Sequence, residues 1–236
     1  MPGGRVKRIS DFDQPHPAGI DERFHVLDVS MVGRVLYWDY FFKLVRDIPG
    51  SIVECGVGRG RSLLILSALN SLYEPEEGGG RDIWAFDSFA GFDEPSPQDD
   101  SWRKPCKGEW ARSPSGAYDY TPEFIGQLLK EAQADVSRVN FVKGYLKDTL
   151  PSYQGGQIAL LNVDCDLYEP YRNALEHLYD KVAPGGVIVF DDFKIEPDPY
   201  ERFPGARKAV HEFLGERVKD LHESIKGSPY YIKPKS

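Results

Sequence analysis

The sequence predicts an α/β fold built on a mainly parallel sheet that helices cover on both faces. Short runs rich in β-branched and aromatic residues recur along the chain, and longer stretches with helical spacing separate them. Most of these short runs are apolar throughout, as in strands buried on both faces. Ligands of such folds lie outside the carboxyl ends of the strands. Functional residues are therefore expected just after Cys55, Phe86, Val163 and Phe190.

Size and composition fit one globular domain and argue against a nucleic-acid binder and a membrane-spanning protein. The chain has 236 residues, of which 41% are hydrophobic and 28% are charged. A net charge of −8 argues against a general nucleic-acid binder. No apolar run approaches the ~20 residues that a membrane span needs. Three cysteines without metal-type spacing (Cys55, Cys106, Cys165) suit a reducing compartment, so we expect a cytoplasmic protein with no membrane or nucleic-acid partner.

The elements follow in order along the chain. Residues 1–32 show no clear periodicity and are expected to form an N-terminal arm. Residues 33–48, GRVLYWDYFFKLVRDI, are predicted to form an aromatic-rich helix that ends at Pro49-Gly50. The predicted strands are Ser51–Cys55, Asp82–Phe86, Asn140–Lys143, Gln157–Val163 and Gly186–Phe190.

Helical patterns lie between and after these strands. One of them opens with Thr121-Pro122-Glu123, a capping residue followed by proline at the first helical position. The predicted helices are Ser62–Leu72, Thr121–Ala132, Tyr171–Val182 and Ala206–Leu214. A turn at residues 226–229 leads into Tyr230–Lys233, which is predicted to belong to an antiparallel edge pair.

One connection is too long for an ordinary turn. Residues 93–120 contain four prolines together with Trp102 and Trp110. Long loops in compact domains are usually lids, binding loops or disordered segments. The tryptophans favour a lid-like loop.

The first strand ends in a glycine-rich turn, Glu54-Cys55-Gly56-Val57-Gly58-Arg59-Gly60. Glycines let the backbone turn tightly and approach a ligand at a helix N-terminus. The dinucleotide pattern G-x-G-x-x-G fails, because its third position is Arg61 or Leu63. The observed E-x-G-x-G-x-G spacing occurs in many S-adenosylmethionine enzymes, and a glycine turn without a ligand is the alternative.

The second and third strands end in further candidates for this pocket. Asp87 follows the second strand and can accept hydrogen bonds from both ribose hydroxyls of an adenosyl group. Its alternative role is a helix N-cap. Gly144 and Tyr145 follow the third strand and could flank the adenine, although Gly-Tyr turns also occur without ligands.

Acidic residues follow the fourth and fifth strands. Asp164-Cys165-Asp166 comes after QIALLNV, and Asp191-Asp192 after GVIVF. Unpaired carboxylates at one sheet edge would repel one another and raise their own pKa values. A hard divalent cation with oxygen ligands removes that conflict, which predicts Mg²⁺. Helix caps and solvated acids are the alternative.

At these residues the sequence resembles the macrocin O-methyltransferase family, the TylF-like sugar O-methyltransferases of antibiotic biosynthesis. The resemblance begins near Ser30-Met31-Val32-Gly33-Arg34 and fades after GARKAVHEF. Its most specific block runs from DCDLYEPY through LYDKVAPGG to VIVFDDF.

The resemblance implies a Rossmann-like class I methyltransferase fold, with a mainly parallel seven-stranded sheet and an antiparallel C-terminal strand. Residues 33–236 would form one methyltransferase domain that includes the lid-like loop. The implied activity is methyl transfer from S-adenosylmethionine to a vicinal hydroxyl, assisted by Mg²⁺. The acceptor would be a sugar of a glycosylated natural product.

The family pattern also assigns residues. It places the metal on Asp164, Asp191 and Asp192 and the general base on Asp164. Independently of the family, Lys194 and His211 are weaker candidates for the base. The expected cofactor-binding set is Glu54, Gly56, Gly58, Gly60, Ser62, Asp87, Ser88, Gly144, Tyr145 and Asp164.

The chain departs from the family pattern at several positions. Gly58 replaces a tryptophan, Arg61 and Cys165 each replace a glycine, and Pro170-Tyr171 replaces a Ser-Thr pair near the acceptor side. Two other functions stay open. One is a catechol-type O-methyltransferase, although Leu167 stands where an Asp-x-x-Lys motif would place its lysine. The other is a non-catalytic S-adenosylmethionine-binding module. A homo-oligomer, formed through the aromatic helix, is also open.

Overall fold

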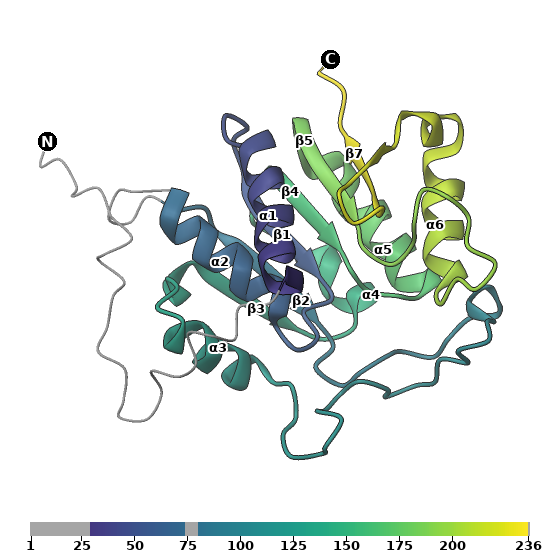
Figure 1. The fold of residues 1–236 in the computed structure, drawn as a ribbon, viewed down its shortest axis with the longest axis horizontal. Coiled ribbons are helices and arrows are strands. Elements are labelled where there is room, and N and C mark those ends of the chain that lie inside the picture. Colours follow the sequence, from purple (N-terminus) through teal and green to yellow (C-terminus); the bar gives the residue numbers. More distant parts are fainter. Residues whose placement is uncertain (1–28, 74–79, 236) are drawn as a thin grey trace, which may run out of the picture.

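The computed structural model describes residues 29–73 and 80–235 and contains a seven-stranded sheet with the order β3-β2-β1-β4-β5-β7-β6 (Figure 1). Strands β1 to β5 run parallel, and β7 is antiparallel to both of its neighbours. The predicted fold class, including the antiparallel C-terminal strand, is therefore confirmed. The strands are β1 Ser51–Cys55, β2 Ile83–Asp87, β3 Val139–Lys143, β4 Ile158–Val163, β5 Val182–Phe190, β6 His222–Glu223 and β7 Pro229–Ile232.

Six α-helices in the described residues cover the two faces of the sheet (Figure 1). Helices α1, α2 and α3 pack on one face, where Phe41, Leu63 and Ile125 share a core with Ile52. Helices α5 and α6, together with the short α4, pack on the other face around Phe190. The helices are α1 Val29–Leu44, α2 Arg61–Tyr73, α3 Pro122–Glu131, α4 Leu146–Thr149, α5 Tyr168–Leu178 and α6 Pro204–Leu214.

Several element boundaries differ from the prediction. Helix α1 begins at Val29, four residues earlier than predicted, so residues 29–32 belong to a helix. The rest of the predicted arm lies outside the described residues. Helix α5 begins at Tyr168 rather than Tyr171, because the Asp99 carboxylate accepts a hydrogen bond from the Tyr168 backbone N–H at 2.8 Å. The predicted extension of this helix to Val182 is wrong, since Val182 pairs with β4 as the start of β5.

The strand order fixes where a ligand can bind. Starting from β1, the chain builds outward through β2 and β3, and β4 then returns to the other side of β1. The crevice between β1 and β4 is thus the point where the order reverses, which is where open α/β sheets bind ligands.

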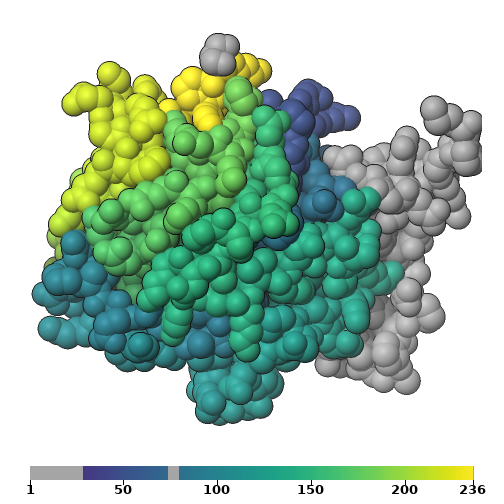
Figure 2. All heavy atoms as spheres, turned by 180° about the vertical axis from the view of Figure 1, so that it is seen from behind, coloured from purple at the N-terminus to yellow at the C-terminus, as the bar shows by residue number. Residues whose placement is uncertain are grey.

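The long connection before α3 lies against the body of the protein. Its 3-10 turn at Pro97–Asp99 contacts α6. Figure 2 shows the blue part of this connection beside the yellow-green C-terminal region. Among residues 29–73 and 80–235, no helix is long and apolar enough to cross a membrane.

Candidate active site

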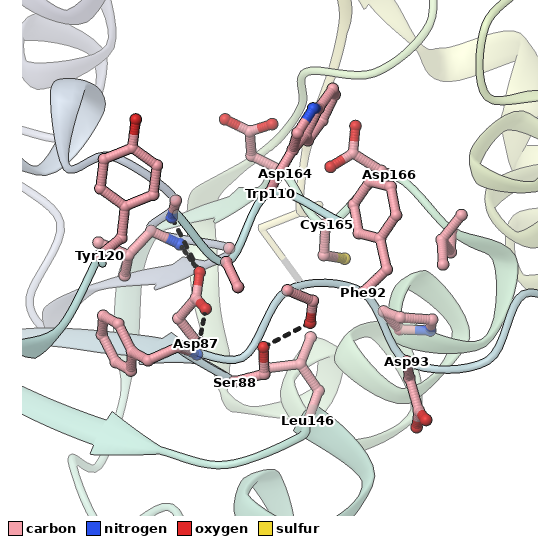
Figure 3. Close-up of a pocket in the computed structure, with 18 of the residues that line it drawn as sticks. Asp87, Ser88, Phe92, Asp93, Trp110, Tyr120, Leu146, Asp164, Cys165 and Asp166 are labelled. Carbon is pink, nitrogen blue, oxygen red and sulfur yellow. Dashed lines mark hydrogen bonds between the residues drawn. The ribbon is translucent and has the colours of Figure 1, made fainter. Parts of the chain in front are cut away.

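A cavity of about 330 Å³ opens at the carboxyl ends of β1, β2, β4 and β5. The glycine turn and the end of β2 line one part of it, and the acids that follow β4 and β5 line another. The loop before α3 contributes Trp110 and Tyr120 (Figure 3). All of these strand tips are predicted functional positions, so the fold brings the motifs to one place.

The three glycines of the turn have different roles. Gly56 has φ +94°, and a Cβ there would lie 1.8 Å from the Asp164 carbonyl oxygen. A Cβ on Gly60 would lie 2.9 Å from the Ile125 side chain. Gly58 has φ +52° and lines the cavity, and a Cβ on it would meet no atom within 4 Å. Two glycines thus allow close packing, while Gly58 leaves space for a ligand.

Asp87 joins the end of β2 to the glycine turn. Its Oδ2 accepts hydrogen bonds from the backbone N–H groups of Val57 and Gly58, both at 2.8 Å (Figure 3). Its Oδ1 accepts a third from the Phe89 N–H at 2.6 Å. Asp87 lines the cavity as predicted, but three backbone donors already occupy the carboxylate. Ribose hydroxyls would therefore share the Asp87 carboxylate with these three backbone N–H groups.

Some of the other expected cofactor residues line the cavity, and others lie outside its lining. Ser62, Ser88 and Tyr145 line the cavity. Gly144 is not among the lining residues, and its N–H donates to the Asp87 carbonyl at 2.9 Å. Gly144 therefore supports the end of β2 through this backbone hydrogen bond.

Glu54 is fully buried beneath the turn and does not line the cavity. One carboxylate oxygen accepts a hydrogen bond from Asn162 Nδ2 at 3.0 Å, and the other has no hydrogen-bond partner among the residues that the structure describes. Burial raises the pKa of Glu54 to about 8, despite the opposing effect of the Asn162 hydrogen bond. This carboxyl group is thus neutral over much of the physiological range.

Three acids line the opposite part of the cavity: Asp164, Asp166 and Asp191. Burial, followed by the charges of Asp191 and Asp192, raises the pKa of Asp164. Burial and Asp192 likewise raise the pKa of Asp166. These carboxylates carry more negative charge than their surroundings compensate.

Asp192 is turned away from the cavity. Its Oδ2 lies 2.8 Å from the Asp166 backbone nitrogen, which donates to it, and 2.8 Å from the Tyr171 hydroxyl. Burial and the Asp191 charge raise the pKa of Asp192 to about 6. The Asp191 carboxylate accepts a hydrogen bond from Lys226 Nζ, which also lies 4.6 Å from the centre of the Tyr37 ring.

The acids fit Mg²⁺ in chemistry but do not converge on one point. Hard carboxylate oxygens with excess negative charge are the donors that this ion prefers. However, the described residues contain no group of three or more His, Cys, Asp or Glu side chains placed to hold a metal ion. Asp192 faces Asp166 and Tyr171, and Asp191 faces Lys226.

Other candidates from the sequence lie elsewhere. Neither Lys194 nor His211 belongs to the cavity lining. Lys194 Nζ donates to the Lys226 carbonyl, and the His211 ring packs against Phe193. All three cysteines are free thiols, and Cys165 lines the cavity.

Sequence reasoning missed the cations of the site. Lys226 reaches Asp191 from a turn 35 residues later, which no local pattern indicates. The arginine side chains of α1 and of the glycine turn also line the cavity. Their proximity depends on how α1 packs against α2, which only the tertiary structure shows.

Comparison with known proteins gives one family. The sequence model of the macrocin O-methyltransferase (TylF) family matches residues 38–226. A tetracenomycin-type rhamnosyl 4'-O-methyltransferase of Streptomyces olivaceus is 29% identical over 172 residues, which cover 73% of this chain and 60% of that protein. Mycinamicin III 3''-O-methyltransferase of Micromonospora griseorubida is 30% identical over 174 residues, covering 72% of this chain and 62% of that protein. The chain thus spans about three-fifths of the curated relatives it matches.

Solved structures share the fold. The calicheamicin methyltransferase CalS11 is similar with a TM-score of 0.76 and 24% identity, covering 97% of this chain and 98% of that one. The O-methyltransferase NovP is similar with a TM-score of 0.67 and 24% identity, covering 87% and 79%. At this identity the likeness concerns the fold, which is that of Rossmann-like methyltransferases.

Proposed function

Since the chain belongs to the macrocin O-methyltransferase (TylF) family, we propose that it transfers a methyl group from S-adenosylmethionine to a sugar hydroxyl in natural-product biosynthesis. One observation carries this proposal: a single cavity joins the glycine turn and Asp87 to the acids that follow β4 and β5. The first set is suited to an adenosyl group, and the second to a hydroxyl that must lose a proton.

The names of the relatives support the sugar as the acceptor. One relative methylates a rhamnosyl group of a tetracenomycin, and another is named for the 3'' position of mycinamicin III. The carboxylates of the cavity suit a polyhydroxylated acceptor, because they can accept hydrogen bonds from its hydroxyl groups.

We assign the general base to Asp164. Its backbone carbonyl lies against Gly56 of the cofactor-binding turn, and the residue lines the same cavity as Asp166 and Asp191. Burial and neighbouring charges raise its pKa, which makes the carboxylate a better proton acceptor. The acceptor oxygen would attack the methyl carbon as the carbon–sulfur bond breaks, and Asp164 would take the hydroxyl proton. The products are the methyl ether and S-adenosylhomocysteine.

We also propose that Asp164, Asp191 and Asp192 hold Mg²⁺. When bound, this ion supplies Lewis acidity that makes an adjacent hydroxyl easier to deprotonate. Its donors would have to exchange present partners, because Asp191 is paired with Lys226 and Asp192 with Tyr171. The mutual repulsion of the acids favours this exchange.

The test measures methyl transfer to glycosylated and catechol acceptors, with and without Mg²⁺. We expect transfer to sugar hydroxyls only. Asp191→Ala should abolish metal-dependent turnover while leaving S-adenosylhomocysteine affinity within about threefold. Asp180→Ala is the control, because Asp180 is exposed and precedes β5 at the opposite edge of the sheet.

Each other outcome has a defined meaning. Unchanged turnover in Asp191→Ala would reject the metal role. Methylation of catechols but not of sugars would reject the acceptor class. Cofactor binding without transfer to any vicinal-hydroxyl acceptor would identify a non-catalytic binding module instead.

A further inference from the structure

Trp110 places a large aromatic side chain in the cavity on a strained stretch of backbone. The residue lines the cavity and is 45% exposed. Its φ is +68°, in the left-handed region that residues other than glycine rarely adopt. Strained residues of this kind persist only where the surrounding structure holds them, and they cluster at binding sites. The contacts around Trp110 must therefore offset this strain.

A nearly buried arginine supports the indole ring. The Arg103 guanidinium lies 4.5 Å from the centre of the Trp110 ring, and the Phe92 ring lies 5.1 Å from it. Arg103 is itself fixed, because both of its terminal nitrogens donate hydrogen bonds to the Glu109 carboxylate. The Arg103 side chain is only 9% exposed, which strengthens its contact with the aromatic ring. The indole is thus held in place before any ligand binds.

A second segment completes this support from the start of α6. Phe203 packs 5.9 Å from the Trp110 ring and 5.1 Å from the Arg103 guanidinium, and Arg202 lies 5.7 Å from the Trp110 ring. The two arginines also act on an acid of the cavity. Burial raises the pKa of Asp166, and the charges of Arg103 and Arg202 oppose this rise. The supported ring therefore belongs to the part of the cavity that the acids line (Figure 3).

We propose that Trp110 is the surface on which the acceptor sugar packs, and that Arg103 is the residue that positions it. A pyranose ring has a face of C–H groups and an edge of hydroxyl groups. The C–H face can pack on the indole, which offers a large apolar area at a small cost in conformational entropy. Asp166 and Asp191 can accept hydrogen bonds from the hydroxyl edge. This inference rests on the proposed sugar methylation.

Such a surface would also select which hydroxyl reacts. Packing against a fixed ring limits the tilt of the sugar, so that one hydroxyl is presented to Asp164 in a reactive orientation. Without the indole, neighbouring hydroxyls could reach the same base. A smaller side chain at position 110 should therefore weaken acceptor binding and mix the methylated positions. A role confined to folding of the loop would leave the methylated position unchanged.

The test measures methyl transfer by the full chain to methyl α-L-rhamnopyranoside, a neutral probe chosen because one relative is named for a rhamnosyl group. Trp110→Ala should raise the KM for this probe about tenfold and increase the share of a second methyl ether, which NMR identifies. Trp110→Phe keeps an aromatic ring and should raise the KM by no more than about threefold. Trp102→Ala is the control, because Trp102 is 63% exposed and is not among the lining residues.

The same assay tests the positioning role of Arg103. Arg103→Gln removes the cation beside the indole and should raise the KM for the rhamnoside about threefold or more. The affinity for S-adenosylhomocysteine, measured by calorimetry, should stay within about threefold of the wild type in this variant and in Trp110→Ala. Arg172→Gln is the matched control, because Arg172 also pairs with a glutamate but lies on α5 outside the cavity.

Two results would overturn the inference and spare the proposed function. One is that Trp110→Ala methylates the rhamnoside with the KM and at the position of the wild type. The other is that Trp110→Ala loses S-adenosylhomocysteine affinity as strongly as acceptor affinity, which would assign Trp110 to the cofactor or to folding. Absence of transfer by the wild type would instead contradict the sugar acceptor, and both proposals would fall together.

Discussion

Glu54 and Gly56 lie two residues apart at the end of β1, yet the surrounding structure constrains them in different ways. Glu54 is constrained by its environment, because it is a buried carboxyl and one of its oxygens has no hydrogen-bond partner within residues 29–73 and 80–235. Gly56 is constrained by space, because the backbone of Asp164, the residue after β4, lies where a side chain would begin. The glycine spacing indicates a tight turn, but the sequence does not show that this turn closes against Asp164.

The first prediction concerns the pH dependence of stability. The pKa of Glu54 rises from about 4.5 in the unfolded chain to about 8 in the folded protein. The folded state therefore binds more protons, so this group's contribution to stability is complete below pH ~4.5 and is lost as the pH rises towards 8. Urea unfolding of the wild type should show this loss. Glu54→Gln should reduce it by on the order of a few kcal/mol between pH 5 and 8.5.

Other buried acids contribute to the same titration, so the comparison between the two proteins is the informative measurement. Gln keeps the acceptor for Asn162 and removes the titrating group. An identical slope in both proteins would show that Glu54 does not carry the shifted pKa.

The second prediction compares two glycines of one turn. Gly56→Ala places a Cβ 1.8 Å from the Asp164 carbonyl oxygen and should destabilise the fold by more than ~3 kcal/mol. Gly58→Ala meets no atom within 4 Å and should cost about 1–2 kcal/mol through its positive φ. Chemical denaturation measures both. Equal losses would contradict the packing role of Gly56.

At the scale of elements, one buried acid links the loop before α3 to the start of α5. Asp99 is 2% exposed. One carboxylate oxygen accepts from the Tyr168 N–H, and the other from the backbone and hydroxyl groups of Ser96. The start of α5 is therefore set by a residue 69 positions earlier. This explains why helical periodicity located α5 but missed its first turn.

The third prediction follows from this anchor. Asp99→Ala leaves the Tyr168 N–H without its partner in a buried position, which should cost about 1–3 kcal/mol. The same change should speed proteolysis within residues 93–120. Asp100→Ala is the control, because the Asp100 side chain is 82% exposed. Equal cleavage rates in the two variants would show that Asp99 does not hold the loop. Whether the loop acts as a lid stays a prediction.

At the scale of the whole molecule, the sequence predicted the sheet but not the charge balance of its cavity. Apolar strands with motifs at their ends imply parallel pairing, and the acids meet at one edge because of it. Two features depend on packing between distant segments: the pairing of Asp191 with Lys226, and the hydrogen bond by which the Tyr171 hydroxyl holds Asp192 away from the cavity. A homo-oligomer stays a prediction.

The fourth prediction tests the cavity as a binding site for the cofactor. A ligand that binds only the folded state stabilises it by about 2.7 kcal/mol at one hundred times its Kd. For a chain of this length, S-adenosylhomocysteine at that concentration should raise Tm by roughly 5–10 °C. Differential scanning calorimetry measures the shift. Adenosine monophosphate at the same concentration is the comparison, and an equal shift would argue against a site built for the sulfur-containing cofactor.

Trp110 gives the cavity a built-in optical signal. Its ring lines the cavity, lies 4.5 Å from the Arg103 guanidinium and packs 5.1 Å from the Phe92 ring. Indole emission responds to a nearby cation and to contact with water, and a bound acceptor would alter both. Occupancy of the acceptor region can therefore be followed by intrinsic fluorescence without a label, with Trp110→Phe providing the background from the remaining indoles.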